Sequence, residues 1–186
     1  MNFINSLTKH KIVEPNKLAG LINGHMIAQA PFRDAVNLYL DNGVILFLDE
    51  KAELVIGSDA NAKKKQPFLH YTEELMNGPV NGSEYFTVDI ENGLCYPRAI
   101  ALYEGDEFTT NNFSTAISGG LVADTKYFAY VDFATGDFEV VAAEPANGGG
   151  LAYVGPLFVA EKDTLAAGQA AVRLTLIDKM ISVTAV

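Results

Sequence analysis

Residues 35–58 read AVNLYLDNGVILFLDEKAELVIGS, and this stretch decides the fold class. Its three apolar runs are separated by Asp41-Asn42-Gly43 and by Asp49-Glu50-Lys51, which are turn-forming sequences between strand-forming ones. The pattern predicts a three-stranded meander from Ala35 to Gly57.

The rest of the chain also consists of apolar runs separated by turn-forming sequences. Asn and Gly tolerate the positive φ of tight hairpin turns, and frequent Asn-Gly pairs would break a long helix. Six such dipeptides begin at Asn23, Asn42, Asn77, Asn81, Asn92 and Asn147. Strands are expected around Asn92-Gly93, in a hairpin around Thr135-Gly136-Asp137, and in the final runs LAYVGPLFVAE and QAAVRLTLIDKMISVTAV. The sequence therefore predicts a mainly β fold of meanders and hairpins, forming one or two small β-barrel or sandwich units with an extended N-terminal arm.

Three parts follow from this pattern. Residues 1–31 form the arm, residues 32–113 form a β-rich domain with a lysine-containing loop at 60–67, and residues 114–186 form a small β-barrel-like region. The arm contains breakers at Pro15, Gly20, Gly24 and Pro31, which prevent one continuous helix. Its apolar residues are too many for a disordered tail: Phe3, Ile4, Leu7, Ile12, Val13, Leu18, Leu21, Ile22, Met26 and Ile27. Two placements remain open, an extended strap across a neighbouring subunit or packing on the arm's own barrel.

Charge and composition limit the possible partners. The 186 residues carry a net charge of −10, and residues 66–161 hold 14 acidic residues against Arg98 and Lys126. Binding of nucleic acid requires clustered Lys and Arg to neutralise phosphates, so no direct nucleic-acid binding is expected. Charged residues make up only 19%, and such a low-charge surface suits assembly.

Cellular location is constrained by Cys95 and by the absence of long apolar runs. A single cysteine cannot form an internal disulfide, so synthesis in a cytoplasm is the simplest expectation. The start MNFINSLTKHK lacks the apolar core of a signal peptide, and no run approaches the roughly 18–20 apolar residues that cross a bilayer. Neither secretion nor membrane association is expected.

No motif for catalysis, a cofactor or a metal emerges. His70 with Glu73 and Glu74 is the only local histidine cluster, and it is expected to be a solvated helical turn. Cys95 stands in an apolar context and is expected in the core. The glycines at 148–150 lead into a strand instead of a helix, as a flexible connection and not a phosphate cradle. The chain is therefore expected not to be an enzyme.

Acidic residues also surround the turn at Gly136. Asp132, Asp137 and Glu139 lack the alternating oxygen ligands and closing Glu of an EF-hand loop, so they are expected to form the hairpin turn. Lys63-Lys64-Lys65 is expected in a solvated loop, with docking onto an acidic protein surface left open.

One group of segments, strongest over residues 66–113, carries a family resemblance. It resembles head accessory proteins of tailed bacteriophages, the capsid cement or decoration class. The segments are Leu69-His70-Tyr71-Thr72-Glu73-Glu74-Leu75, Glu84-Tyr85-Phe86, Tyr96-Pro97-Arg98-Ala99 and Leu102-Tyr103-x-Gly105-Asp106-x-Phe108-Thr109-Thr110-Asn111.

The resemblance implies a virion structural protein without cofactors that binds an assembled capsid lattice and stabilises the head. Its expected partners are the major capsid protein and copies of itself, and its expected location is the capsid surface. Ala99 to Tyr103 would be a buried strand, Glu104 to Asp106 a corner, and Thr109 to Asn112 a polar edge free to hydrogen-bond. The base of a head fibre or a tail-associated role also fits this class.

The expected interface combines the arm with this polar edge. Its residues are Phe3, Ile4, Leu7, Ile12, Val13, Leu18, Ile22, Met26, Thr109, Thr110, Asn111 and Asn112. Two rival functions stay open. A carbohydrate- or receptor-binding β module would need clustered exposed aromatic residues, and a glycosidase would need a cleft holding two carboxylates about 5–10 Å apart.

Overall fold

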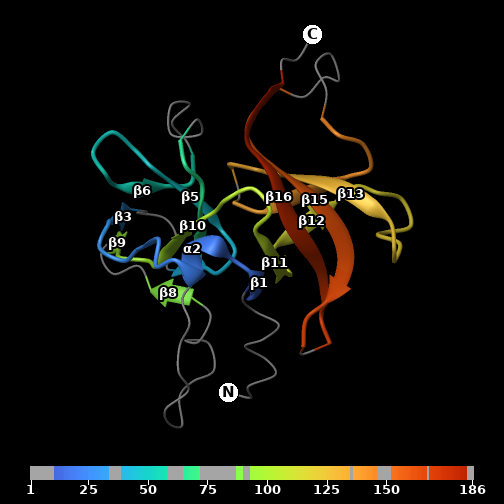
Figure 1. Cartoon of the computed structure of the whole chain (residues 1–186), viewed down its shortest axis with the longest axis horizontal. Coiled ribbons are helices and arrows are strands. Elements are labelled where there is room, and N and C mark those ends of the chain that lie inside the picture. The colour runs from blue at the N-terminus through green and yellow to red at the C-terminus, as the bar shows by residue number, and fades with distance from the viewer. Residues whose placement is uncertain are drawn as a thin grey trace.

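The computed structural model describes residues 11–33, 39–57, 65–71, 87–89, 93–134, 136–145, 152–166 and 168–183. It confirms the predicted mainly β fold, because strands dominate and two seven-stranded sheets form the molecule. In Figure 1 the two sheets lie side by side, and the long strands of one sheet curl into a half-barrel.

The first sheet has the strand order β1-β11-β16-β15-β13-β14-β12. All its neighbours are antiparallel except β12 and β14, which are parallel. Its strands are β1 (Val13–Lys17), β11 (Glu107–Thr110), β12 (Phe113–Thr115), β13 (Lys126–Val131), β14 (Phe138–Val141), β15 (Tyr153–Thr164) and β16 (Ala170–Val183). The predicted hairpin around Gly136 is the antiparallel pair β13–β14, and it is confirmed.

The second sheet has the order β2-β10-β7-β5-β6-β3-β9. Its strands are short: β2 (Met26–Ile27), β3 (Phe32–Arg33), β5 (Ile45–Leu48), β6 (Leu54–Val55), β7 (Phe68–His70), β9 (Leu94–Cys95) and β10 (Ala99–Ala101). A separate antiparallel pair joins β4 (Tyr39–Asp41) to β8 (Thr87–Asp89). The only helix in the described part of the chain is the single turn α2 (Ala19–Ile22).

The predicted meander is correct in its turns and its second hairpin but wrong in its first pairing. β5 and β6 form an antiparallel hairpin, and Gly43 takes the positive φ of +90° that the preceding turn requires. However, β4 pairs with β8 and not with β5. The Gly43 N–H donates to the carbonyl of His70 instead, so the turn is held by β7, a distant part of the chain.

One hydrophobic core joins the two sheets. Ile45, Leu69 and Leu102 from the side of the second sheet lie in the same buried cluster as Phe108 and Phe158 from the first. The rings of Phe108, Phe138 and Phe158 pack edge-on or tilted, with centroids 5.2–6.0 Å apart. Such aromatic contacts add to the free energy gained by burying the rings.

The sheets divide the chain differently from the three expected parts. β1, from the expected arm, and β11 belong to the same sheet as the C-terminal strands, whereas β2 belongs to the second sheet. The expected boundary after residue 113 falls inside β12. The chain crosses from the first sheet to the second between β1 and α2, as Figure 1 shows.

Several predictions lie outside the described residues. These are most of the lysine-containing loop, the helical turn expected after Tyr71 and the glycines at 148–150.

Candidate functional site

The corner between β10 and β11 is closed by one buried carboxylate. Asp106 Oδ2 accepts the N–H of Tyr103 at 2.8 Å, and the Asp106 N–H donates to the Tyr103 carbonyl at 2.9 Å. Gly105 has a φ of +88°, which glycine adopts without strain. The other carboxylate oxygen, Oδ1, accepts the N–H of Ala19 at 2.8 Å. Asp106 therefore links the corner between β10 and β11 to Ala19, the first residue of α2.

The expected polar edge from Thr109 to Asn112 is not an edge, and this prediction was wrong. β11 pairs with β1 on one side and with β16 on the other, so it is an interior strand. Thr109, Thr110 and Asn112 are buried. The sequence did not reveal that β11 is an interior strand, because its neighbours β1 and β16 lie far away from it along the chain.

These polar side chains instead hold the N-terminal strand in place. Thr110 Oγ1 donates to the carbonyl of Ile12 at 2.8 Å, and Asn111 Oδ1 accepts the N–H of Ile12 at 2.6 Å. Asn16 Nδ2 donates to Thr109 Oγ1 at 2.9 Å. The side chains thus fasten β1 to β11, within one chain.

The arm residues separate into a buried and an exposed group. Ile12, Val13 and Leu18 are buried in the chain's own hydrophobic clusters, so residues 12–18 pack on their own sheet and do not form a free strap. Ile22 and Met26 face solvent, and Phe3, Ile4 and Leu7 lie outside the described residues. Asn111 is half-buried.

The exposed group forms an apolar surface on α2 and β2. Ile22 is 79% exposed, and Leu21 and Met26 are each 41% exposed. We call these three residues the α2–β2 surface. Leu21 was not among the predicted interface residues. The sequence did carry a signal for it, because the apolar pair Leu21-Ile22 directly precedes the turn sequence Asn23-Gly24.

The backbone beneath this surface is held tightly. Gly20 packs so closely on β10 that a Cβ atom there would lie 2.2 Å from the Ala101 carbonyl oxygen. The Ala101 N–H donates to the His25 carbonyl at 3.0 Å, and the His25 N–H donates to the Gly20 carbonyl at 2.7 Å. Leu21, Ile22 and Met26 are therefore presented by a segment with a fixed backbone.

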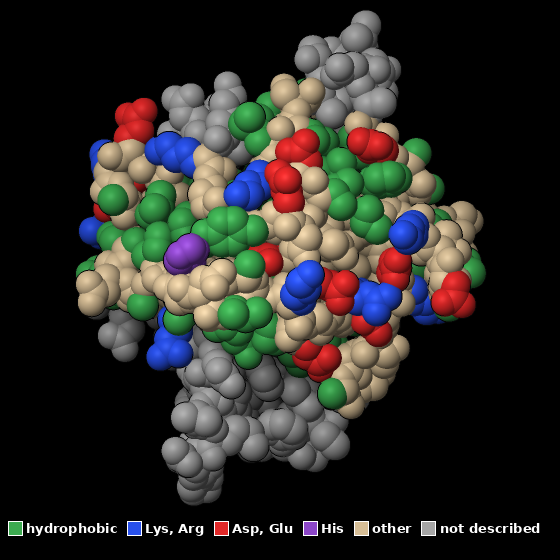
Figure 2. Space-filling view, in the orientation of Figure 1, with side chains coloured by type: hydrophobic (Ala, Val, Ile, Leu, Met, Phe, Trp, Pro, Cys, Tyr) green, Lys and Arg blue, Asp and Glu red, His purple; other side chains and the backbone are tan. Residues whose placement is uncertain are grey.

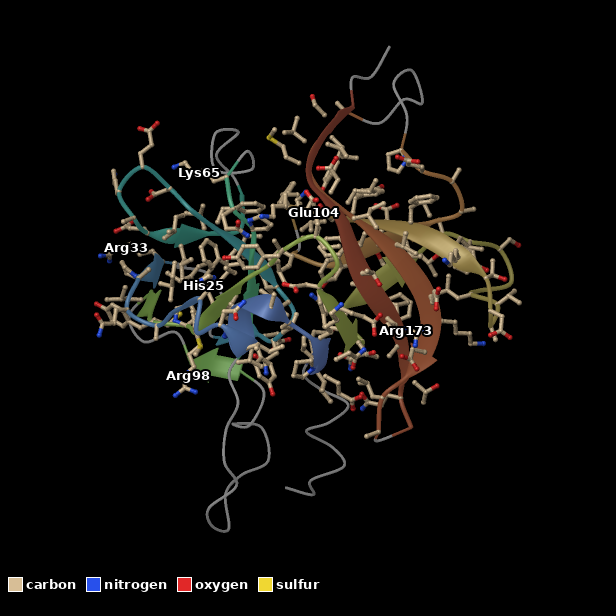
Figure 3. All side chains as sticks on the ribbon, viewed as in Figure 1. His25, Arg33, Lys65, Arg98, Glu104 and Arg173 are labelled. Atoms are coloured by element: carbon tan, nitrogen blue, oxygen red, sulfur yellow. The ribbon has the colours of Figure 1, made fainter. Side chains whose placement is uncertain are left out.

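A polar cluster flanks the same surface. His25 Nδ1 lies 2.7 Å from the Tyr103 hydroxyl, and Lys179 Nζ lies 4.5 Å from the centre of the Tyr103 ring. Figure 2 shows a histidine bordered by hydrophobic side chains, with acidic side chains gathered mainly over the other half of this face. In Figure 3 His25 and Arg98 lie on the side of the second sheet, whereas Arg173 lies on β16. The α2–β2 surface thus lies away from the main concentration of acidic side chains.

His70 does not lie in a solvated helical turn, and that prediction was wrong. It lies in β7 and is fully buried, with Nδ1 2.8 Å from the carbonyl oxygen of Asp41. Because a carbonyl oxygen only accepts, Nδ1 carries the proton of this hydrogen bond. Burial lowers the pKa of His70 from 6.5 to about 4, against the opposing effect of the hydrogen bond to Asp41.

The other chemical candidates have structural roles. Cys95 is buried, as expected. The carbonyl of Asp132 accepts the Gly136 N–H at 2.7 Å, and its carboxylate accepts the Ala134 N–H at 2.9 Å, so this acidic residue forms the hairpin turn. Among the described residues, no group of three His, Cys, Asp or Glu side chains is placed to hold a metal ion.

A charged hollow on the outer face of the first sheet contains two carboxylates. It has a volume of about 350 Å³ and includes Glu107, Glu161, Lys126 and Arg173. Glu161 is ion-paired with Arg173. A glycosidase acid needs an apolar environment that keeps its carboxyl protonated, whereas these carboxylates share the hollow with two cations. The hollow therefore resembles a surface charge network more than a hydrolytic site.

Exposed aromatic residues do not cluster in the described part of the chain. Tyr96, 57% exposed, is the one aromatic among the strongly exposed large apolar residues there. Sugar-binding surfaces generally offer several aromatic faces for stacking. Nothing in the described surface favours the carbohydrate-binding alternative.

Comparisons with known proteins returned no similarity: no family model, curated protein or solved structure matches this chain. Within the described residues, no helix has the length and apolar character to span a membrane.

Proposed function

We propose that this protein is a non-enzymatic structural component of a tailed-bacteriophage virion, which binds the assembled capsid lattice and stabilises the head. The major capsid protein is its partner, the capsid surface is its location, and no cofactor takes part. The contact is made through the α2–β2 surface. Capsid cement and the base of a head fibre are both roles of this kind.

The observation that carries the proposal is the exposure of Leu21, Ile22 and Met26 on a fixed backbone. An apolar side chain that is 79% exposed, such as Ile22, contributes little to folding, because most of its area stays in contact with water. Holding a surface in its binding conformation lowers the entropy lost on association. Gly20 and Asp106 supply this rigidity, through the close contact with Ala101 and the hydrogen bond to Ala19.

The energy available from this surface is modest for one copy. Complete burial of an Ile, Leu or Met side chain contributes about 1.5–3 kcal/mol, and association removes part of that gain. A repeating shell offers many equivalent sites, so contacts between neighbouring copies would add to the binding. A small apolar contact is therefore sufficient for a protein that coats a lattice.

Binding to heads assembled without this protein tests the proposal. Purified protein is incubated with such heads, and the bound copies are counted after sedimentation. We expect saturable binding that raises the temperature at which the heads release DNA. Ile22→Asp combined with Met26→Asp should reduce binding by about tenfold or more, since a charge would be buried at the contact.

Val122→Asp is the matched control, because Val122 is also strongly exposed but lies between β12 and β13. It should bind normally. Absence of binding by the folded wild-type protein would refute the proposal. Equal loss in the control and the double variant would refute the role of the α2–β2 surface.

A further inference from the structure

Lys179 of β16 has a half-buried side chain whose ammonium group is held in place. Its Nζ atom donates to Gln66 Oε1 at 3.3 Å and lies 4.5 Å from the centre of the Tyr103 ring. Gln66 is fastened in turn, because its Nε2 group donates to the carbonyl oxygens of Pro67 and Leu102. A hydrogen bond and a cation–π contact thus fix a charge that a lysine usually carries on a flexible stem.

Tyr103 links this ammonium group to the α2–β2 surface. The Tyr103 hydroxyl lies 2.7 Å from His25 Nδ1, and the centroids of the two rings are 5.8 Å apart. Met26, which belongs to the α2–β2 surface, directly follows His25 in the chain. The ammonium group of Lys179 therefore stands at the rim of an exposed apolar surface.

No carboxylate of the described residues forms an ion pair with Lys179. The carboxylate of Asp178, its neighbour in β16, accepts the Met180 N–H at 2.8 Å. Glu104, exposed at the β10–β11 corner, is not within ion-pair distance of the ammonium group. Charge-assisted hydrogen bonds to carboxylates are among the stronger polar contacts of proteins. A fixed ammonium group without a counter-charge is therefore suited to a carboxylate from outside.

The chain next to Gln66 adds positive charge to this corner. The run Lys63-Lys64-Lys65 directly precedes Gln66, and its last residue is exposed and without an ion pair in the described part of the chain. Residues 58–64 lie outside the described residues, and they contain one acidic residue, Asp59. The sequence adjoining the ammonium group thus has more cations than anions.

The acidic run Glu73-Glu74 follows the opposite end of β7. Before β7, Gln66 donates to the Leu102 carbonyl. After β7, the Tyr71 N–H donates to the Arg98 carbonyl at 3.2 Å, and the acidic run follows Tyr71. Because the basic run and the acidic run join β7 at different ends, the charge next to the ammonium group is positive. This arrangement favours a carboxylate from another molecule.

We propose that the α2–β2 surface and Lys179 together bind an acidic segment of the partner protein, in which a carboxylate stands next to aliphatic side chains. The inference rests on the proposed function, since it names the chemistry of the partner at the same surface. The carboxylate accepts a hydrogen bond from Lys179 Nζ, and the aliphatic side chains cover Leu21, Ile22 and Met26. Covering the apolar surface excludes water, so the charged contact is stronger than an exposed ion pair.

The charge distribution favours a short acidic segment over a polyanion. The chain has a net charge of −10, and Figure 2 shows acidic side chains over much of the same face. A long row of phosphates would extend over this acidic region and be repelled. A single carboxylate needs only the ammonium group of Lys179.

Removing the charge of Lys179 tests the inference. Lys179→Met keeps an unbranched side chain without the ammonium group, and Lys179→Arg keeps the charge. Heads assembled without this protein should bind Lys179→Met about tenfold more weakly than wild type, and Lys179→Arg within about threefold of wild type. Raising NaCl from about 0.05 M to about 0.5 M should weaken wild-type binding more than binding of Lys179→Met, because salt screens the charged contact.

Lys162→Met is the matched control. It removes the same charge from an exposed position near the tip of the β15–β16 hairpin, and it should bind like wild type. A peptide assay measures the surface chemistry without capsids, using a fluorescent peptide of alternating Glu and Leu and a counterpart with Gln in place of Glu. Wild type should bind the Glu peptide about tenfold more tightly than the Gln peptide, and Lys179→Met should bind both alike. Circular dichroism verifies that each variant is folded.

Unchanged binding by folded Lys179→Met, to heads and to the Glu peptide, would overturn the inference. If this variant also melted earlier than wild type, Lys179 would pair with a carboxylate of its own chain. Loss of folding in Lys179→Met would leave the comparison of the two peptides on wild type decisive.

The same measurements judge the proposed function separately. Heads that bind wild type and Lys179→Met equally would uphold the capsid as partner and refute the acidic segment. Binding of the Glu peptide that depends on Lys179, without any binding to heads, would uphold the acidic segment and refute the capsid as partner.

Discussion

His70 is a buried histidine that remains neutral near neutral pH in the folded protein. Its pKa is about 4 in the folded state and about 6.5 in the unfolded chain. Below pH 6.5 the unfolded state therefore binds more protons than the native state. The stability that neutral His70 contributes is complete above about pH 6.5 and is lost as the pH falls toward 4.

The first prediction follows from this shift. Between pH 7.5 and 4, protonation of His70 should lower the free energy of unfolding by about 3 kcal/mol. His70→Asn keeps a donor for the Asp41 carbonyl and removes the titration. Urea unfolding at several pH values should show a smaller pH dependence for the variant than for wild type. Identical pH dependence would mean that His70 does not contribute to acid sensitivity.

At the scale of elements, core packing and side-chain hydrogen bonds together place the N-terminal segment on the fold. Asp106 bonds the start of α2 to the β10–β11 corner, and Leu18, between β1 and α2, is buried in the core shared by both sheets. Thr109, Thr110 and Asn111 hydrogen-bond to β1 or to the residue before it. The segment is thus part of the folded domain and carries the α2–β2 surface.

Asp106→Ala should loosen α2. The substitution leaves the N–H groups of Ala19 and Tyr103 without their acceptor, which should cost about 1–3 kcal/mol of stability. Hydrogen exchange of residues 18–27 should rise more than exchange in β13. Glu104→Ala, at an exposed position of the same corner, is the control and should change little. Unchanged exchange in α2 would show that Asp106 does not anchor it.

Leu18→Ala should destabilise the whole domain. Removing a buried leucine from the core costs about 2–5 kcal/mol, through lost burial and the cavity that remains. Lys17→Ala, its exposed neighbour, should have a small effect. Thermal melting measures both variants. A Leu18→Ala protein that melts like wild type would favour the alternative in which this segment serves only a neighbouring subunit.

For the whole molecule, the shared core predicts cooperative unfolding. Phe158 of the first sheet and Leu69 of the second lie in one buried cluster. Phe158→Ala should cost about 3–5 kcal/mol and should increase hydrogen exchange in β7 as much as in β13. Calorimetry of wild type should show one transition. Two transitions, or exchange that rises in the first sheet alone, would show that the sheets unfold independently.

Local chemistry allowed the sequence to predict the fold class and several turns. Gly43, Gly93 and Gly136 each adopt the positive φ expected from turn sequences between apolar runs. Cys95 is buried within the apolar context that surrounds it along the chain. These properties depend on residues a few positions apart, because a turn dipeptide restricts its own φ and ψ angles wherever it occurs.

Only the tertiary structure decided which strands pair and which side chains become buried. Thr110 and His70 are polar residues that the sequence placed in solvent, yet both are buried with hydrogen-bond partners from distant segments, Ile12 and Asp41. Within one arm, Leu18 entered the core and Ile22 remained exposed. The sequence by itself determined where the chain can turn and extend, because those preferences are local. Burial and strand order came from contacts between distant segments, which local preferences do not specify.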